Sequence, residues 1–430
     1  MLKSIQRLSG LWFGFLIWPF GVFLYSIRNI LNKHYQKLII AFSFLYGYTV
    51  YPYSGDIINY REWFSIVASY NIYDYLYILQ NTFSTESLVS YQVTNNMVTQ
   101  PDVFAISLQF LVSRFTENPR WFWGIVSVIY TSFMFMFVNQ ITKEVNWLNK
   151  NFGQLLFFAF LLLVIPFYVG VTGVRFWPAL FLFCTYLVKY IYRPKAKYIG
   201  YAALSILIHY SFFVPVAILL IKHLLPDNRF FYRLLVVFSL MIFASTSSGY
   251  LLSTLEGYTS IFNETVVEER VNSYTDQDVL QQRTQKQSQN NWYVSLRSDS
   301  ILYFLLILTF MEISGFWKFH ENEFTEKMFP YLTIFFCVTL LTINLGSIGR
   351  FKNIFYLLAL SRYVHLFGLQ PWDSRLRFSS YILFPILILY ILVTFRAGFY
   401  TIDPLLLIHN VVTAFFLESD LSLSEFLVGH

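Results

Sequence analysis

The chain has 430 residues, of which 56% are hydrophobic and only 13% are charged, and its net charge is +6. A soluble domain carries about 25% charged residues, so the composition excludes a water-exposed globule, and the small positive charge gives no support for a nucleic-acid partner. Apolar runs long enough to cross a bilayer recur along the sequence, and they predict an all-α polytopic integral membrane protein.

About ten transmembrane spans are predicted, and together they form a single membrane domain over residues 1–430. Each predicted span is an apolar run bounded by charged or turn-forming residues. The spans are placed at 10–27, 37–53, 120–140, 152–169, 175–192, 231–248, 300–318, 328–346, 351–367 and 379–396. Lysines and arginines in the short connections assign the cytoplasmic side, and they place two longer segments outside.

The first outward segment, 54–118, is rich in tyrosine and is expected to carry interfacial helices, one of them at 102–115. The second, 250–299, is the longest polar stretch of the chain and predicts an outward loop. Residues 197–224 fit either one tilted span, as their length allows, or a broken or re-entrant segment, which satisfies the charges on both sides, and both interpretations stay open. A re-entrant segment would turn near His209 and return to the cytoplasmic side, with its irregular backbone lining a protein cavity.

Five ionisable residues from distant parts of the chain are expected on the outer side of this topology. They are Asp56, Arg175, His209, Arg270 and Arg350. Taken singly, an arginine at a span end can snorkel to the headgroups, a histidine can be a helix contact, and an aspartate can cap a helix. Two span-end arginines on one side better suit the binding of a phosphate-bearing lipid.

Several motifs of catalysis and cofactor binding are absent from the sequence. There is no HExxH, CxxC, P-loop, GxGxxG or GxSxG pattern. The sequence therefore predicts a reaction that uses neither a metal nor a cofactor.

At these same residues the chain resembles the EpsG/Wzy-like polysaccharide polymerases. The resemblance rests on an arginine-then-histidine pattern, GVTGVRFWPALFLFCTYLVKY followed by ALSILIHYSFFVPVAILL, and on three further elements in the same order. These elements are SGDIINYREWF, ERVNSY and GRFKNIFYLLAL. Phe176 follows the arginine where the family more often has a polar glutamine.

The resemblance implies a GT-C-like glycosyltransferase of the bacterial inner membrane with its active site facing outward. It would join oligosaccharide repeat units carried on undecaprenyl diphosphate, as in O-antigen, capsule or exopolysaccharide synthesis. The implied partners are this lipid-linked oligosaccharide, the surrounding membrane lipids, a chain-length regulator and a flippase.

The candidate site residues suit this chemistry. A departing diphosphate needs cations, which Arg175, Arg270 and Arg350 would supply. The acceptor hydroxyl needs a base, for which His209 and Asp56 are both candidates. Three tyrosines are expected to contact sugars: Tyr60, Tyr210 and Tyr274.

Three alternatives remain open. An O-antigen ligase would use the same donor but usually has a larger outward domain. A transporter of lipid-linked oligosaccharide would favour inverted repeats, which the sequence lacks. A membrane acyltransferase would use His209 with an Asn or Asp. Lengthening of a glycan chain distinguishes the polymerase from a transporter.

Overall fold

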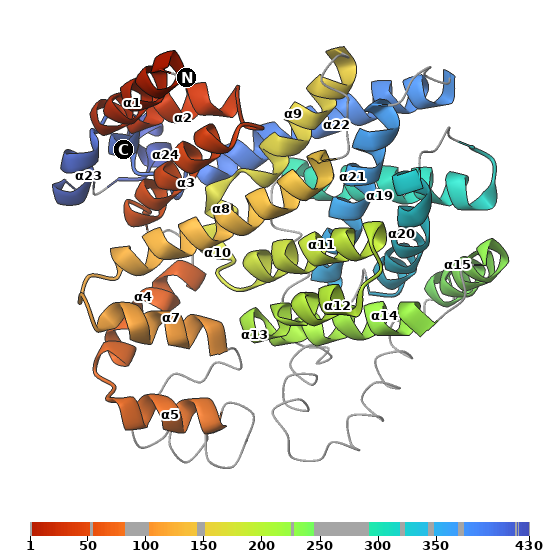
Figure 1. The fold of residues 1–430 in the computed structure, drawn as a ribbon, viewed down its shortest axis with the longest axis horizontal. Coiled ribbons are helices and arrows are strands. Elements are labelled where there is room, and N and C mark those ends of the chain that lie inside the picture. The colour runs from red at the N-terminus through yellow and green to blue at the C-terminus, as the bar shows by residue number, and fades with distance from the viewer. Residues whose placement is uncertain are drawn as a thin grey trace.

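The computed structural model of the protein describes residues 2–51, 55–81, 103–143, 151–224, 228–244, 292–318, 323–342, 348–368, 374–417, 419 and 421–429. Within these ranges the chain folds into helices and turns without a β-strand, as the predicted all-α class requires. Figure 1 shows the helices packed as one bundle, with the N- and C-terminal segments side by side at one corner.

The N-terminal half contains mostly short helices. They are α1 (Leu2–Ile17), α2 (Pro19–Ile27), α3 (Lys33–Tyr48), α4 (Gly55–Ala68), α5 (Ile72–Asn81), α7 (Val103–Ser113), α8 (Arg120–Thr142), α9 (Asn151–Val164), α10 (Phe167–Thr172), α11 (Phe176–Tyr192), α12 (Ala196–Ala203) and α13 (Ser205–Ile208).

In the described residues of the C-terminal half lie the longer helices and three short turns of 3₁₀ helix. They are η1 (Tyr210–Phe212), α14 (Phe213–Leu224), α15 (Arg229–Ala244), α19 (Trp292–Ser314), α20 (Glu323–Thr342), η3 (Ile348–Phe351), α21 (Lys352–Gly368), α22 (Ser374–Gly398), η4 (Pro404–Leu407), α23 (Val411–Phe416) and α24 (Leu423–Val428).

Among the described residues, three helical stretches are long and apolar enough to cross a membrane: Arg120–Thr142, Glu323–Thr342 and Arg377–Gly398. Shorter apolar helices accompany them, including Phe176–Tyr192 in α11. The protein is thus a helical membrane protein. The predicted count of about ten spans and the GT-C-like architecture remain predictions.

Two predicted spans, 10–27 and 152–169, are each divided between two helices. Trp18 separates α1 from α2, and Pro19 begins the second helix. Pro166 precedes α10 in the same way. A proline lacks the backbone N–H of a continuing helix and disfavours the helical conformation of the residue before it. Apolar composition alone therefore overestimated the continuity of these two runs.

A chain of helix contacts runs through the middle of the bundle. Helix α8 packs against α3 and α11, α11 packs against α20, and α20 packs against α15 and α21 (Figure 1). Gly47 permits the close approach of α3 and α8, because a Cβ there would lie 2.3 Å from the Trp123 carbonyl oxygen and from Ser127 Oγ. Small residues at a helix crossing allow such close packing in membrane proteins.

The first predicted outward segment contains a helix near the predicted place, α7 (Val103–Ser113), and its location at the membrane interface remains a prediction. Helix α7 packs against α4, and Phe110 stacks on Tyr75 of α5 with ring centroids 4.3 Å apart. The predicted second loop, 250–299, ends earlier than expected because α19 begins at Trp292. Residues 250–291 lie outside the described ranges.

The C-terminal segment after α22 folds back over the first helices of the chain. Trp18 Nε1 donates to the Leu407 carbonyl at 2.7 Å, and the Tyr51 amide donates to the Thr401 carbonyl at 3.0 Å. Asp403 organises the turn, because its carboxyl oxygens accept from the backbone N–H of Leu405 at 2.8 Å and of Ser419 at 3.3 Å. A buried carboxyl thus connects the two ends of this segment.

Replacing Asp403 with alanine should lower the free energy of unfolding by about 1–2 kcal/mol, because two backbone N–H groups lose their acceptor. Thermal unfolding in detergent measures this loss, and Asp403→Asn, which keeps one acceptor oxygen, should lose less. An unchanged midpoint in Asp403→Ala would contradict the proposed role of the carboxyl.

The pH dependence offers a second check on Asp403. Burial raises the pKa of its carboxyl above the ordinary value of 3.8. A raised folded-state pKa gives a stability contribution that is complete below the unfolded pKa and is lost as the pH rises through the folded pKa. The wild-type midpoint should therefore fall relative to Asp403→Asn as the pH increases through this range.

Candidate functional site

Residues 196–224 form a broken helical segment, a helical hairpin, and its re-entry into the membrane remains a prediction. Helices α12 and α13 lead to His209, the 3₁₀ turn η1 follows, and α14 returns to pack against α12 (Figure 1). His209 is extended, with φ −148° and ψ 109°, so it ends one helix and begins the next. Pro215 lies in the first turn of α14, where a missing N–H costs little.

The imidazole of His209 stabilises the tip of this hairpin. Its Nδ1 lies 3.1 Å from Ser211 Oγ and 3.4 Å from the Ser211 backbone nitrogen, which donates to it. The side chain therefore takes the place of a helix N-cap. Because Nδ1 accepts from the backbone N–H of Ser211, it carries no proton, so the proton of the neutral ring lies on Nε2 and the Ser211 hydroxyl can donate to Nδ1 as well.

Aromatic residues surround His209 and leave it 8% exposed. The Phe176 ring meets it edge to face, with centroids 5.9 Å apart, and Phe212 lies at 6.3 Å. Phe176 is the residue at which the sequence departs from the usual family pattern. It joins the first turn of α11 to the hairpin tip, so an apolar contact stands where a polar one was expected.

Arg175 lies at the start of α11, directly before Phe176. It is the N-cap residue of that helix and is partly buried. Its guanidinium carbon lies 6.0 Å from the centroid of the Tyr60 ring, a distance at the outer limit of a cation–π contact. The α10–α11 turn therefore holds Arg175 between helix α4 and the hairpin tip.

Tyr60 is more deeply packed than a sugar-stacking residue would need to be. It is 5% exposed, and its ring packs against those of Trp63, Phe122 and Trp123. Gln109 of α7 donates to its backbone carbonyl at 3.0 Å. These contacts favour a role in positioning Arg175, and a direct sugar contact stays a prediction.

The third element at this end is η3, which carries Arg350. Arg350 is exposed, whereas the next residue, Phe351, is 5% exposed and packs against Phe212 with centroids 6.3 Å apart. Arg350 therefore lies directly beside a residue that contacts the hairpin tip. Tyr210, half-buried in η1, has its ring centroid 5.8 Å from that of His209.

The remaining predicted residues are only partly located. Asp56 lies in the first turn of α4, four residues before Tyr60. Arg270 and Tyr274 lie outside the described residues. In the part of the chain that the structure describes, no three His, Cys, Asp or Glu side chains gather as metal ligands would.

Sequence reasoning missed one buried ion pair. Arg362 of α21 pairs with Glu312 of α19 and also donates to the Thr325 carbonyl of α20, and the arginine is fully buried. The signal was available, because charges inside a predicted span are rare and mark either function or essential packing. Arg362 lies twelve residues beyond Arg350 in sequence, so this pair is remote from the hairpin tip.

Comparison with known proteins gives one match. No curated protein and no solved structure matches the chain. The model of the EpsG family, however, matches residues 32–403, a range that contains every candidate site residue. This match and the apolar helices indicate a membrane protein of polysaccharide biosynthesis, with a polymerase-like glycosyltransferase activity. The chain belongs to the EpsG family.

Proposed function

We propose that the protein joins oligosaccharide repeat units carried on undecaprenyl diphosphate, on the outer face of the bacterial inner membrane. The observation that carries this proposal is the convergence of three separate elements: the start of α11 with Arg175, the hairpin tip with His209, and η3 with Arg350. The order of these elements agrees with the family's pattern. The proposal includes a metal-independent, GT-C-like mechanism, in which arginines stabilise the charge of the leaving group.

In the proposed reaction, a sugar hydroxyl of the incoming lipid-linked unit attacks the anomeric carbon of the growing chain. The new glycosidic C–O bond forms as the bond from that carbon to the lipid diphosphate breaks. The leaving diphosphate keeps the electron pair, and the hydroxyl proton passes to His209 or to Asp56. Arg175, Arg270 and Arg350 stabilise the charge that develops on the diphosphate.

Aromatic burial supports this assignment of roles. Phe176 and Phe212 exclude water from one side of His209, which strengthens hydrogen bonds and charge interactions there. Tyr60 holds Arg175 near the same place. Tyr210 and Tyr274 remain candidates for sugar binding. A flippase that supplies the donor and a chain-length regulator are the proposed partners.

The test is polymerisation by the purified protein with its lipid-diphosphate repeat unit, followed as a ladder of lengthening glycans. Arg175→Ala should lower the rate by roughly ten- to 150-fold, because a hydrogen bond to a charged group contributes about 1.5–3 kcal/mol. Arg175→Lys should recover part of the rate, since lysine restores the positive charge but cannot form the bidentate hydrogen bonds of a guanidinium.

The matched control is Arg377→Ala, at an exposed position of α22, which should leave the ladder unchanged. Equal losses in both variants would show a general effect of removing positive charge and would contradict the assigned role of Arg175. A wild-type protein that moves the lipid-linked unit across vesicles without lengthening it would support a transporter.

A further inference from the structure

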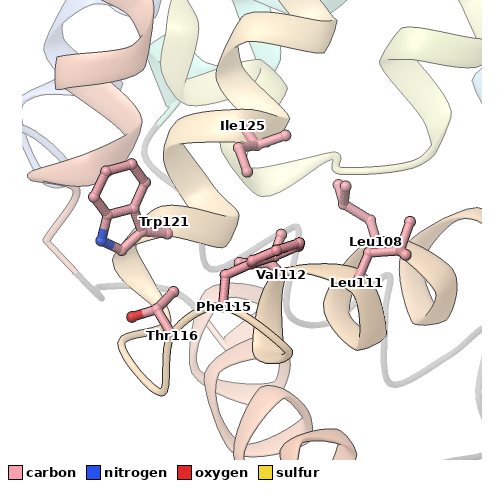
Figure 2. Close-up of a pocket in the computed structure, with 7 residues that line it drawn as sticks. All are labelled: Leu108, Leu111, Val112, Phe115, Thr116, Trp121 and Ile125. Atoms are coloured by element: carbon pink, nitrogen blue, oxygen red, sulfur yellow. The ribbon is translucent and has the colours of Figure 1, made fainter. Parts of the chain in front are cut away.

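An apolar groove lies between α7 and α8. Its lining is Leu108, Leu111, Val112, Phe115, Thr116, Trp121 and Ile125, as Figure 2 shows. Its volume is about 620 Å³, and ligand pockets occupy about 300–1,000 Å³. Six of the seven side chains are apolar or aromatic, so the groove suits a hydrocarbon.

The groove is open, and three of its residues are uncovered. Leu111 is 57% exposed, Phe115 is 88% exposed and Trp121 is 39% exposed. In a soluble protein such a patch would mark an interface. In a membrane protein it faces acyl chains, so apolar character alone does not identify a specific occupant. The position of the groove in the fold and the charged residues beside it identify the occupant.

Both helices that line the groove also contact elements of the candidate site. Helix α7 packs against α13, the helix that ends at His209. On the other wall, Phe122 follows Trp121 and packs against Tyr60, beside which Arg175 lies. The two helices that form the groove therefore also pack against the elements that carry residues proposed to bind diphosphate.

Positive charge flanks the groove at the loop between α7 and α8. Arg114 precedes Phe115, and its guanidinium carbon lies 4.6 Å from the centroid of the Phe110 ring. Arg120 precedes Trp121 and lies over Tyr48 at 5.8 Å. An apolar channel with cations at one end complements a lipid that has a long tail and an anionic headgroup.

We infer that this groove holds the isoprenoid tail of the lipid-linked substrate, with the tail lying between α7 and α8. The inference rests on the proposed function, because it assumes a substrate carried on an isoprenoid diphosphate. The tail leaves the site past α7 and enters the groove laterally. A hydrocarbon fixed in this way would orient the diphosphate toward Arg175.

The experiment uses the full chain in phosphatidylcholine nanodiscs and a long-chain polyisoprenyl diphosphate that carries a diazirine in its tail. Photolabelled peptides are identified by mass spectrometry. Label is expected in residues 103–125, and Leu111→Trp, which fills the groove, should lower it about tenfold. The matched control Leu220→Trp, at a 48% exposed position of α14, should leave the labelling unchanged.

Two competitors identify the occupant. Unlabelled long-chain polyisoprenyl phosphate should displace the probe, whereas added dioleoyl phosphatidylglycerol, an anionic phospholipid, should not. Equal displacement by the phospholipid would show a groove for any anionic lipid and would overturn the inference. Label elsewhere in the chain, or undiminished label in Leu111→Trp, would overturn it as well.

The labelling requires no turnover, so it separates this inference from the proposed function. Label in 103–125 with no glycan lengthening by the wild type would contradict the polymerase and support the groove. Glycan lengthening with a rate unaltered by Leu111→Trp, and no label in 103–125, would support the polymerase and overturn the groove.

Discussion

Replacement of His209 by alanine is expected to slow polymerisation by about 10²–10⁴-fold, the usual contribution of a positioned general base. The imidazole is held at the hairpin tip by Ser211 and is enclosed by Phe176 and Phe212. It therefore has a fixed orientation at the end of the bundle where Arg175 also lies. The rate of ladder formation under saturating donor and acceptor measures the effect.

The matched control is His223→Ala. His223 lies on α14 of the same hairpin, is exposed, and hydrogen-bonds Tyr190, so its loss removes a histidine from the hairpin without touching the tip. If His209→Ala polymerises at the wild-type rate and unfolds at the wild-type temperature, His209 is not the general base. Asp56→Asn then tests the other candidate base.

Ser211→Ala distinguishes orientation from folding at the same place. Ser211 acts on the reaction only through His209, so its loss should lower kcat less than the loss of His209. Ser211→Thr, which keeps a hydroxyl beside Nδ1, should recover the rate. Equal losses of rate in Ser211→Ala and Ser211→Thr would indicate a structural effect instead.

Arg362→Ala should destabilise the protein by about 3–5 kcal/mol, the largest stability loss expected from a single substitution here. The change leaves the Glu312 carboxylate buried without its charged partner, and such an isolated charge is costly in an apolar interior. It also removes the donor to the Thr325 carbonyl, so α19, α20 and α21 lose a shared contact. Thermal unfolding and the yield of monodisperse protein in detergent measure the loss.

The double variant Arg362→Met with Glu312→Leu tests this cause. Buried ion pairs replaced by apolar residues of similar size are often neutral or more stable, so the double variant should recover most of the lost stability. A double variant as unstable as Arg362→Ala would show that the hydrogen bond to Thr325, and not the isolated charge, dominates. Glycan lengthening in the folded double variant should stay near wild type, since the pair is remote from His209.

The hairpin was predictable because the charges on both of its sides constrained it. Basic residues at each end of 197–224 were consistent with an even number of crossings, although a single tilted span stayed open, and the polar run His209-Tyr210-Ser211 marked the turn. The breaks at Trp18 and Pro166 were visible as prolines, but hydropathy summed over a window conceals where a helix stops. Ends of elements depend on backbone hydrogen bonds that composition does not record.

The candidate site could be predicted in part. Topology placed Arg175, His209 and Arg350 at one end, and the described contacts agree for the elements that carry them. The deep packing of Tyr60 was not predictable, since its burial depends on three aromatic rings from α4 and α8. Ser211 was overlooked because its value arises only from the extended backbone at His209.

The contact between Trp18 and Leu407 joins residues 389 positions apart in sequence. A bond of this range cannot form until the later residue has been synthesised and inserted, so it closes late in biogenesis, after the intervening helices have entered the bilayer. Until then the first helices must keep their place through local packing alone. Contacts between distant segments form slowly because loop closure precedes any gain from the contact. The C-terminal segment thus completes the bundle by packing on the first helices, and it can do so only after that segment has been translated.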